Sequence, residues 1–309
     1  LLGGGRTDVW DPAGGDLVFP AEIEIRPLGR RPAPADVWAV DGGQALVADA
    51  RTVAVYVTRA ATVRWRQGRC VLEEEGQLDC HLLGGGEGRA TLAAAGAPVA
   101  AQAAADVNLL RDWAEWRAVA AAVDGADPGA VVLVDGDLQP DWRIPSSWLA
   151  GLMGTAAARH VTLAGVTKHS SLARGGAPLV GWLEARAEAV MGPRATWWAA
   201  VAHTRPDVAP GIEVAVARLD PDARFAFRVD LPAGAPAAEV LGAVSALCDD
   251  AAFPGYPYPL SVADRLAACP GWLRQDVWSQ LQEGFWSAGL AADVAERAFS
   301  DRHRLMERS

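Results

Sequence analysis

The stretch at residues 38–49, WAVDGGQALVAD, places one carboxylate directly after an apolar run. Three apolar residues lead into Asp41 and two glycines, and the apolar pattern then resumes and continues through residues 51–57, RTVAVYV. The alternation predicts a strand, a turn or bulge that glycine permits, and further strand. A carboxylate in an apolar strand is costly to bury unless a cation, a metal or hydrogen-bond donors accompany it. The alternative is that Asp41 caps a tight Asp-Gly hairpin turn.

A second stretch of the same kind follows later in the chain. Residues 130–138, AVVLVDGDL, run from five apolar residues into Asp135, which is typical of a strand buried on both faces. Between the two stretches, residues 102–123 carry apolar side chains at three- and four-residue spacing, which predicts a helix. Asp112 and Glu115 lie three residues apart on a neighbouring face of this helix. A fold that brings these acids together can hold two divalent metal ions.

Length and composition limit the class of protein. The chain has 309 residues, of which 51% are hydrophobic, so it can bury a sizeable core. Its net charge of -10 argues against a protein that binds nucleic acid over its whole surface, but a basic groove or channel is compatible with it. No apolar run reaches the roughly eighteen residues of a membrane span. The four cysteines form no CxxC pair and no signal-peptide pattern is present, so we expect reduced thiols in a cytoplasmic protein.

The rest of the chain divides into three expected parts. Residues 1–35 are rich in glycine and proline and are expected to form an N-terminal arm. Residues 36–268 alternate strand-like and helical patterns and are expected to form the main domain. Residues 269–309 are helical in pattern and rich in tryptophan, which predicts a helical C-terminal extension. Tryptophan is enriched in interface cores, so these aromatic side chains favour a homodimer.

The order of these elements predicts the fold class. Antiparallel strands with a turn at Gln67-Gly68 come first, and a helix and strands at residues 130–135 and 161–166 follow. This order describes an α/β protein with a ribonuclease-H-like mixed sheet flanked by helices. In such a sheet, acids from the first and fourth strands lie side by side. Two metal ions about 3.5–4 Å apart can then contact the attacking and leaving oxygens of a phosphodiester, and carboxylates suit Mg²⁺ and Mn²⁺, which prefer oxygen ligands.

Five motifs in this order resemble the NurA family of DNA-repair nucleases. They are a VDGG strand, a helix with a glutamate, and the segments VVLVDGDL, LAGVTKHSS and GYPYPLSVADRLA, which span residues 36–268. The resemblance implies a ribonuclease-H-like fold, a ring-like homodimer, and Mn²⁺ or Mg²⁺ as the cofactor. It also implies a 5′–3′ exonuclease and single-strand endonuclease of DNA end resection, and a HerA-type hexameric ATPase that feeds DNA into the ring. Cutting polarity and the preferred form of DNA stay open from the residues themselves.

The resemblance also implies roles for single residues. The catalytic residues that it implies are Asp41, Glu115, Asp135, Tyr256 and Asp264, and the first three are the metal ligands. Asp112 is close enough along the helix to be the ligand in place of Glu115. Asp264 stands where the family usually has a histidine. An aspartate at this position can bind metal, but it cannot act as the same neutral nitrogen ligand or base.

Three basic residues are candidates for contacts with DNA. Lys168 is the one lysine of a chain that otherwise uses arginine, and it lies at a predicted strand end near the proposed site. Arg64 and Arg66 point to one face of a strand, either toward phosphate or at a solvated edge. Structural alternatives also exist for the acids, since Glu115 can pair with Arg111 on a helix surface and Asp135 can simply end a strand.

Two other functions compete with the nuclease. An actin-like ATPase shares the ribonuclease-H-like core and uses Asp-Gly turns at nucleotide phosphates, but it needs a glycine-rich adenosine loop in a second half. The glycine-rich segment at residues 84–88 falls too early for that loop. A non-catalytic DNA clamp or adaptor subunit would keep the fold without cleavage, and Asp264 in place of histidine is the main support for it.

Overall fold

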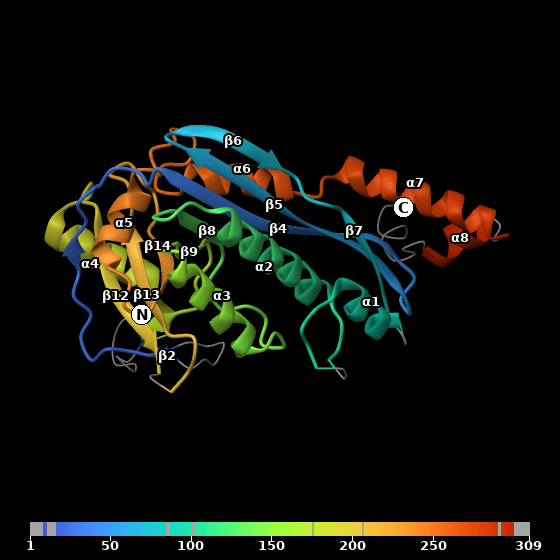
Figure 1. Ribbon diagram of the computed structural model, residues 1–309, viewed down its shortest axis with the longest axis horizontal. Helices are drawn as coiled ribbons and strands as arrows, with labels where there is room; N and C mark the ends of the chain where they lie inside the picture. The colour runs from blue at the N-terminus through green and yellow to red at the C-terminus, as the bar shows by residue number, and fades with distance from the viewer. Residues whose placement is uncertain are drawn as a thin grey trace.

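The computed structural model describes residues 9–10, 17–84, 87–100, 103–174, 176–205, 207–289 and 292–299 (Figure 1). The strands of the described residues are β1 (Val9–Trp10), β2 (Leu17–Val18), β3 (Arg26–Pro27), β4 (Asp36–Asp49), β5 (Ala54–Arg66), β6 (Arg69–Glu74), β7 (Asp79–Leu83), β8 (Val131–Asp135), β9 (Thr162–Thr167), β10 (Ala173–Arg174), β11 (Ala177–Pro178), β12 (Trp197–Thr204), β13 (Ile212–Arg218) and β14 (Phe227–Pro232). The helices are α1 (Glu87–Ala95), α2 (Val107–Gly125), α3 (Ser146–Ala158), α4 (Leu179–Met191), α5 (Ala237–Ser245), α6 (Tyr258–Ala267), α7 (Gly271–Ser287) and α8 (Ala292–Phe299).

One mixed sheet organises the described chain. Its order is β2-β12-β13-β14-β9-β8-β4-β5-β6, with β3 added beside β12 and β7 beside β5. The central strands β4, β8 and β9 are parallel neighbours, whereas β5, β6 and the strands from β12 to β14 pair antiparallel. Parallel central strands have helices on both faces, which explains why β8 is apolar along its buried length. The predicted mixed sheet flanked by helices is confirmed.

Strands β4, β5 and β6 form a long antiparallel meander. The expected turn between β5 and β6 lies at Gln67 and Gly68, which both have positive φ angles of 49° and 75°. Two consecutive positive φ values are typical of a two-residue hairpin whose twist matches that of its strands. The turn between β4 and β5 likewise uses a positive φ at Arg51.

The predicted turn or bulge at Asp41 and its two glycines is wrong, and so is the alternative of a hairpin cap. β4 continues through this position, with Asp41 opposite Ala61 and Gly43 opposite Arg59 in unbroken register with β5. The register of β4 shifts only later, between Leu46 and Ala48. The glycines therefore serve another purpose, which is the close approach of two helices to this strand.

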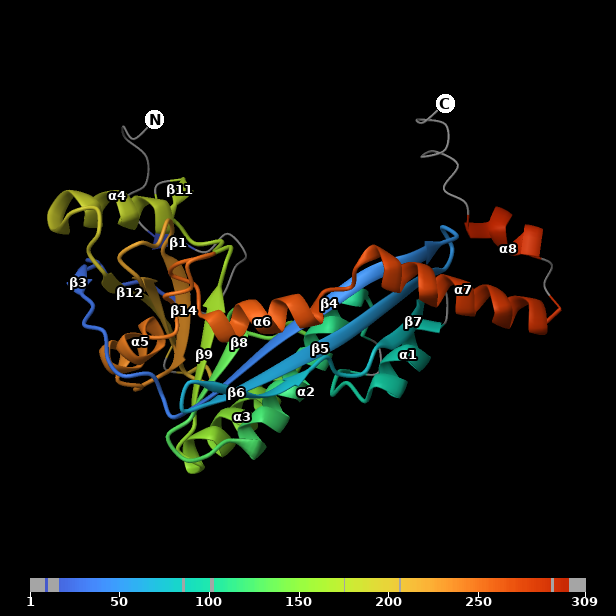
Figure 2. The ribbon, with the colours of Figure 1, turned by 90° about the horizontal axis from the view of Figure 1, so that it is seen from above.

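Helices cover both faces of the sheet with separate apolar cores. Alternate residues of β4 face opposite ways, so Trp38 and Val40 pack with α2, α3 and α4, while Val37 and Ala39 pack with α5 and α6. Figures 1 and 2 show α2 along one face of the β4–β5 ribbon and α6 along the other. Asp41 follows Ala39 in this alternation and therefore faces α6.

Strand β3 and helix α8 lie at opposite ends of this arrangement (Figure 2). The described part of the predicted N-terminal arm adds β2 and β3 to the edge of the sheet, and Arg31 N donates a hydrogen bond of 2.8 Å to Gly242 O in α5. At the other end, α7 and α8 extend beyond the sheet, and Leu273 is the one buried residue identified in α7 among the described positions. None of the helices that the structure describes is long and apolar enough to cross a membrane.

Candidate active site

Two aspartates meet at the ends of neighbouring parallel strands. The register pairs Val40 of β4 with Val134 of β8, so the next residues, Asp41 and Asp135, lie side by side. Asp135 follows Leu133 in the alternation of β8, as Asp41 follows Ala39 in β4, and Leu133 and Ala39 share the core beneath α6. Both carboxylates therefore point to the same face of the sheet, as the sequence predicted.

Helix α6 brings a third carboxylate to this pair. Asp264 lies in the second half of the helix, and one carboxylate oxygen each from Asp41, Asp135 and Asp264 lies within 4.8 Å of the others. Arg59 of β5 holds the carboxyl end of α6 in place, because its guanidinium donates hydrogen bonds to the carbonyls of Ala267, at 3.3 Å, and Ala268. Arg59 was not predicted from the sequence, where its only signal is a basic residue inside an apolar strand.

The two glycines after Asp41 make this convergence possible. A Cβ on Gly43 would lie 1.8 Å from Ala267 O, so any side chain would displace the end of α6. On the opposite face, a Cβ on Gly42 would lie 2.7 Å from an oxygen of Glu115. Glycine at both positions thus lets α6 and α2 approach the strand from its two sides.

Glu115 is the carboxylate that α2 supplies. It is only 3% exposed, which excludes the surface pair with Arg111 that its spacing suggested. Burial raises its pKa well above the usual value, and the charge of Asp41 adds to this effect. Asp112, one turn earlier, instead accepts a hydrogen bond of 2.6 Å from Asp141 N in the loop after β8. The two helical acids therefore lie in different surroundings, and Glu115 is the one beside Asp41.

The electrostatics of the cluster favour a bound cation. Burial raises the pKa of Asp41 to about 7, and the charges of Asp135 and Asp264 add to the rise, while Lys168 and the Gly42 N–H lower it. The pKa of Glu115 is raised as well. Acidic groups with raised pKa values in one cleft are typical of functional sites. Carboxylate oxygens are also the ligands that Mg²⁺ and Mn²⁺ prefer, so the residues present fit a divalent metal.

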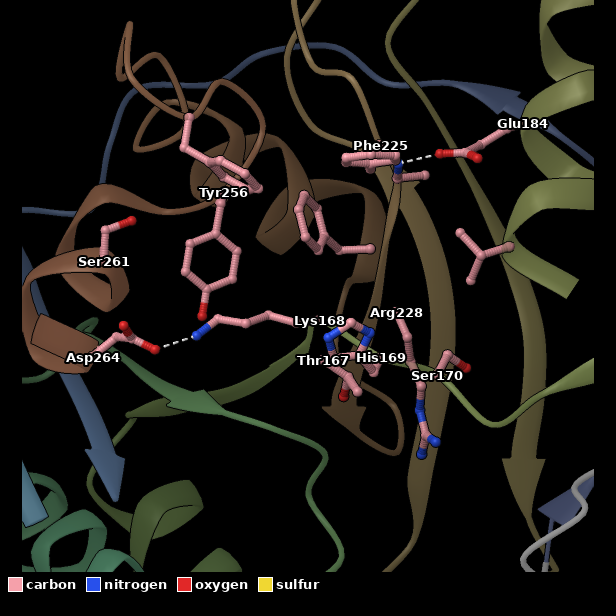
Figure 3. Close-up of a pocket in the computed structure, with 14 residues that line it drawn as sticks. Thr167, Lys168, His169, Ser170, Glu184, Phe225, Arg228, Tyr256, Ser261 and Asp264 are labelled. Carbon is pink, nitrogen blue, oxygen red and sulfur yellow. Dashed lines mark hydrogen bonds and ion pairs between the residues drawn. The ribbon is translucent and has the colours of Figure 1, made fainter. Parts of the chain in front are cut away.

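Lys168 and Tyr256 complete the site (Figure 3). Lys168 Nζ lies 2.6 Å from an oxygen of Asp135 and 2.5 Å from one of Asp264. Burial lowers the pKa of Lys168, but its hydrogen bonds to these two carboxylates outweigh that effect and raise it. The buried hydroxyl of Tyr256 points toward the same place and makes no hydrogen bond of ordinary geometry. Burial and the neighbouring charge of Asp135 raise its pKa.

The two predicted arginines are not brought to the acids. Arg64 and Arg66 lie three and five residues beyond Ala61, the partner of Asp41, at the end of β5. Arg64 donates two hydrogen bonds of 2.8 Å to Asp36, and its guanidinium lies 4.5 Å from the ring centre of Trp38. Arg66 forms an ion pair with Asp127. Both side chains thus neutralise acids of the fold.

A buried ion pair, which no pattern in the sequence predicted, supports the turn after Asp135. Arg228 is 3% exposed and donates two hydrogen bonds of 2.8 Å to Asp230, which is fully buried. Asp230 in turn accepts a hydrogen bond of 3.3 Å from Leu138 N, at the end of the VDGD segment. Gly136 N bonds to Val166 O at 3.1 Å, so the turn is tied to β14 and to β9.

Comparison with known proteins supports this fold. No protein-family model and no curated protein sequence matches the chain. Among solved structures, the NurA nuclease from Sulfolobus solfataricus is similar with a TM-score of 0.55 and 14% identity, covering 86% of this chain and 88% of that one. Another NurA crystal structure is similar with a TM-score of 0.50 and 9% identity, covering 77% of this chain and 86% of that one. The ribonuclease-H-like fold is therefore confirmed, and the resemblance to NurA is confirmed in structure over most of the chain.

Proposed function

We propose that this protein is a divalent-metal-dependent deoxyribonuclease of the NurA type that hydrolyses phosphodiester bonds. The observation that carries the proposal is the convergence of Asp41, Asp135 and Asp264 from three separate elements within 4.8 Å, with Glu115 buried beside Asp41. The likeness of the fold to NurA structures agrees with it.

Each residue of the site has a role that its surroundings suggest. Asp41, Asp135 and Asp264 would hold Mn²⁺ or Mg²⁺, and Glu115 would contribute from the other side of β4. When bound, such an ion supplies charge stabilisation to the phosphate and lowers the pKa of bound water. Lys168 presents an ammonium at the open side of the cluster, where it would neutralise a phosphate oxygen. The hydroxyl of Tyr256 would orient the same group.

The finer activity follows from the resemblance to NurA. We propose 5′–3′ exonuclease and single-strand endonuclease activity in DNA end resection, in a cytoplasmic complex with a HerA-type hexameric ATPase. The net charge of -10 supports a need for that partner. A protein of this charge repels bare DNA at long range, so a translocase that delivers DNA would raise its concentration at the acids.

A homodimer is part of the same proposal. Helix α7 carries Trp272 and Trp286 with 67% and 76% of their surface exposed. Large exposed aromatic side chains on a helix that extends beyond the sheet favour a contact with a second copy. Light scattering at micromolar concentration tests this, and a monomer alone would contradict it.

The test of the proposed function is digestion of labelled single-stranded DNA by the purified protein with Mn²⁺, with Mg²⁺ and with EDTA. We expect cleavage with a divalent ion and none with EDTA. Asp276→Ala, an exposed aspartate on α7, is the matched control and should cut as the wild type does. If the protein binds DNA but cleaves it under none of these conditions, the nuclease proposal is wrong and the non-catalytic clamp is the better explanation.

The role of the partner needs a separate assay. Duplex DNA is incubated with the protein and Mn²⁺ in matched salt, with and without a HerA-type ATPase and ATP. We expect the motor to stimulate duplex degradation strongly, while cutting of single strands needs only the metal. Equal duplex rates in the two reactions would leave a free-standing nuclease.

A further inference from the structure

A cavity of about 600 Å³ opens directly beside the acid cluster (Figure 3). It lies between the end of β9, the start of β14 and the loop that leads into α6. Lys168, Tyr256 and Asp264 belong both to the wall of this cavity and to the site described above. The volume is in the range of small-molecule sites, which is roughly 300–1,000 Å³. A group bound at the acids therefore has a continuous path into the cavity.

One wall of the cavity consists of aromatic side chains, two of them buried and two about half exposed. Phe227 and Tyr256 are 4% and 2% exposed, with ring centres 5.3 Å apart. Phe253 contacts both rings, at 6.4 and 6.2 Å, yet is 48% exposed. Phe225 is 47% exposed on the β14 side. Two buried rings thus support the wall, and two half-exposed rings leave part of their surface accessible to an occupant.

The half-exposed rings sit on constrained backbone. Glu184 of α4 accepts a hydrogen bond of 2.5 Å from Ala226 N, directly after Phe225 (Figure 3). On the other side, Gly255 has a φ of 94°, and a Cβ there would lie 2.4 Å from Ala223 Cβ. The loop between Phe253 and Tyr256 is therefore packed tightly against the segment that leads to Phe225. Preorganised aromatic groups bind planar ligands with little ordering cost.

We propose that this cavity is the subsite for a nucleobase of single-stranded DNA, next to the phosphodiester at the acid cluster, with Phe225 and Phe253 as its stacking surfaces. The inference rests on the proposed function, because a metal ion held by the acids and the ammonium of Lys168 would bind the phosphate and leave the attached base to reach the cavity. Stacking on aromatic rings tolerates every base, since each has a π-face. A paired base cannot enter, so the subsite selects single strands.

The first test measures binding without cleavage. Single-stranded oligonucleotides carry one 2-aminopurine, a base whose fluorescence falls on stacking, at each position in turn. Ca²⁺ replaces Mn²⁺ so that a divalent ion can occupy the acids, and a gel verifies that the strands stay intact. We expect quenching by the wild-type protein at one or two positions, and its loss in Phe225→Ala and Phe253→Ala. Val190→Ala, which shortens an exposed apolar side chain on α4 outside the cavity, should quench as the wild type does. Phe225→Leu, which keeps apolar area but lacks a ring, should resemble the alanine variant.

The second test measures cleavage of DNA with Mn²⁺. A single abasic residue is placed beside a given bond, and the cutting of that bond is compared with that in intact DNA. Stacking of one base on an aromatic side chain is worth a factor of roughly 5 to 150, so the wild type should cut beside the abasic residue at least about fivefold more slowly. The two alanine variants should cut intact and abasic DNA at more similar rates.

The outcomes separate the base subsite from the nuclease. If the wild type cuts intact and abasic strands at equal rates, the proposed base subsite is wrong and the proposed nuclease activity is retained. If no DNA is cut, the nuclease is wrong and the quenching assay alone decides the subsite. Quenching that persists in both alanine variants, or is absent from the wild type, overturns the subsite in either case.

Discussion

Strand β4 carries two buried aspartates with opposite surroundings. Asp36 is 4% exposed and Asp41 is 8% exposed, so burial alone does not distinguish them. Burial would raise the pKa of Asp36, but hydrogen bonds from Arg64 and from Asp127 N outweigh it and hold that pKa below its usual value. Asp41 faces Asp135 and Asp264, and burial together with their charges raises its pKa to about 7.

The difference lies in how each carboxylate is compensated. Asp36 has a guanidinium of the same chain at 2.8 Å, so its charge is neutralised within the fold. Asp41 shares one lysine with two further acids. A buried carboxylate with its own arginine is a structural element, whereas converging acids with too few cations suit an added metal ion. Five predictions test this contrast, from the largest expected effect to the smallest.

The largest effect is expected for loss of a site carboxylate. Asp41→Ala and Asp135→Ala should each reduce Mn²⁺-dependent DNA cleavage by orders of magnitude, because each removes a ligand of the metal site. The fold should persist, as judged by circular dichroism. Arg64→Ala, at the structural cluster, should still bind and cut DNA when folded. Cleavage at the wild-type rate by either aspartate variant would make the site assignment wrong.

The second prediction separates the two acids of α2. Glu115→Gln should be close to inactive, because Glu115 lies against Gly42 and beside Asp41. Asp112→Asn should keep most of its activity, since that side chain holds the loop at Asp141 and its amide can still accept the hydrogen bond. The measurement is the cleavage rate at saturating Mn²⁺. If Asp112→Asn is inactive and Glu115→Gln is active, the metal ligand of α2 is Asp112, one turn earlier.

The third prediction concerns stability at the structural cluster. Asp36→Ala should lower the free energy of unfolding by about 3–5 kcal/mol, because it leaves Arg64 without its buried partner. Urea denaturation measures the change. Glu24→Ala, which removes an exposed partner of Arg26, is the control and should change stability by about 1 kcal/mol or less. A small effect for Asp36→Ala would show that solvent satisfies Arg64.

The fourth prediction uses pH to separate the two aspartates. Asp41 keeps its proton in the folded protein up to about pH 7, while the unfolded chain loses it near pH 4. The metal-free protein should therefore lose stability as pH rises between these values, by up to ~1.4 kcal/mol per pH unit from this group. Asp36 has a lowered pKa, so its contribution is present above about pH 4 and is lost on acidification. The measurement is the free energy of unfolding in EDTA as a function of pH, from pH 3 to 8. Asp41→Asn should weaken the fall in stability between about pH 4 and 7, and Asp36→Asn should weaken the loss of stability below about pH 4. If stability between about pH 4 and 7 depends on pH in Asp41→Asn as it does in the wild type, the raised pKa of Asp41 is wrong.

The smallest effect is the stabilisation that the metal provides. Mn²⁺ at tenfold excess over its Kd should raise the free energy of unfolding at pH 7 by about 1.4 kcal/mol. Asp41→Asn and Asp135→Asn should abolish this gain, whereas Asp112→Asn should retain it. Thermal unfolding with and without Mn²⁺ measures the difference. An equal gain in all variants would place the ion elsewhere.

The sequence by itself predicted the strands that carry Asp41 and Asp135, because an apolar run that ends in a carboxylate is a local pattern. It also predicted the helix with Glu115, the turn at Gln67 and the class of sheet, since each depends on residues that are neighbours along the chain. It misjudged the glycines after Asp41, because a glycine needed for a turn and one needed for close approach look alike in sequence.

Only the tertiary structure decided which charges meet. Arg64 and Asp36 are 28 residues apart and Lys168 and Asp264 are 96 apart, and nothing in their local spacing shows either pair. The register between β4 and β8 places Asp135 beside Asp41. The end of α6 against Gly43 then adds Asp264. Electrostatic energy depends on distances in space and on burial, so one strand carries both a neutralised aspartate and an aspartate of the candidate metal site.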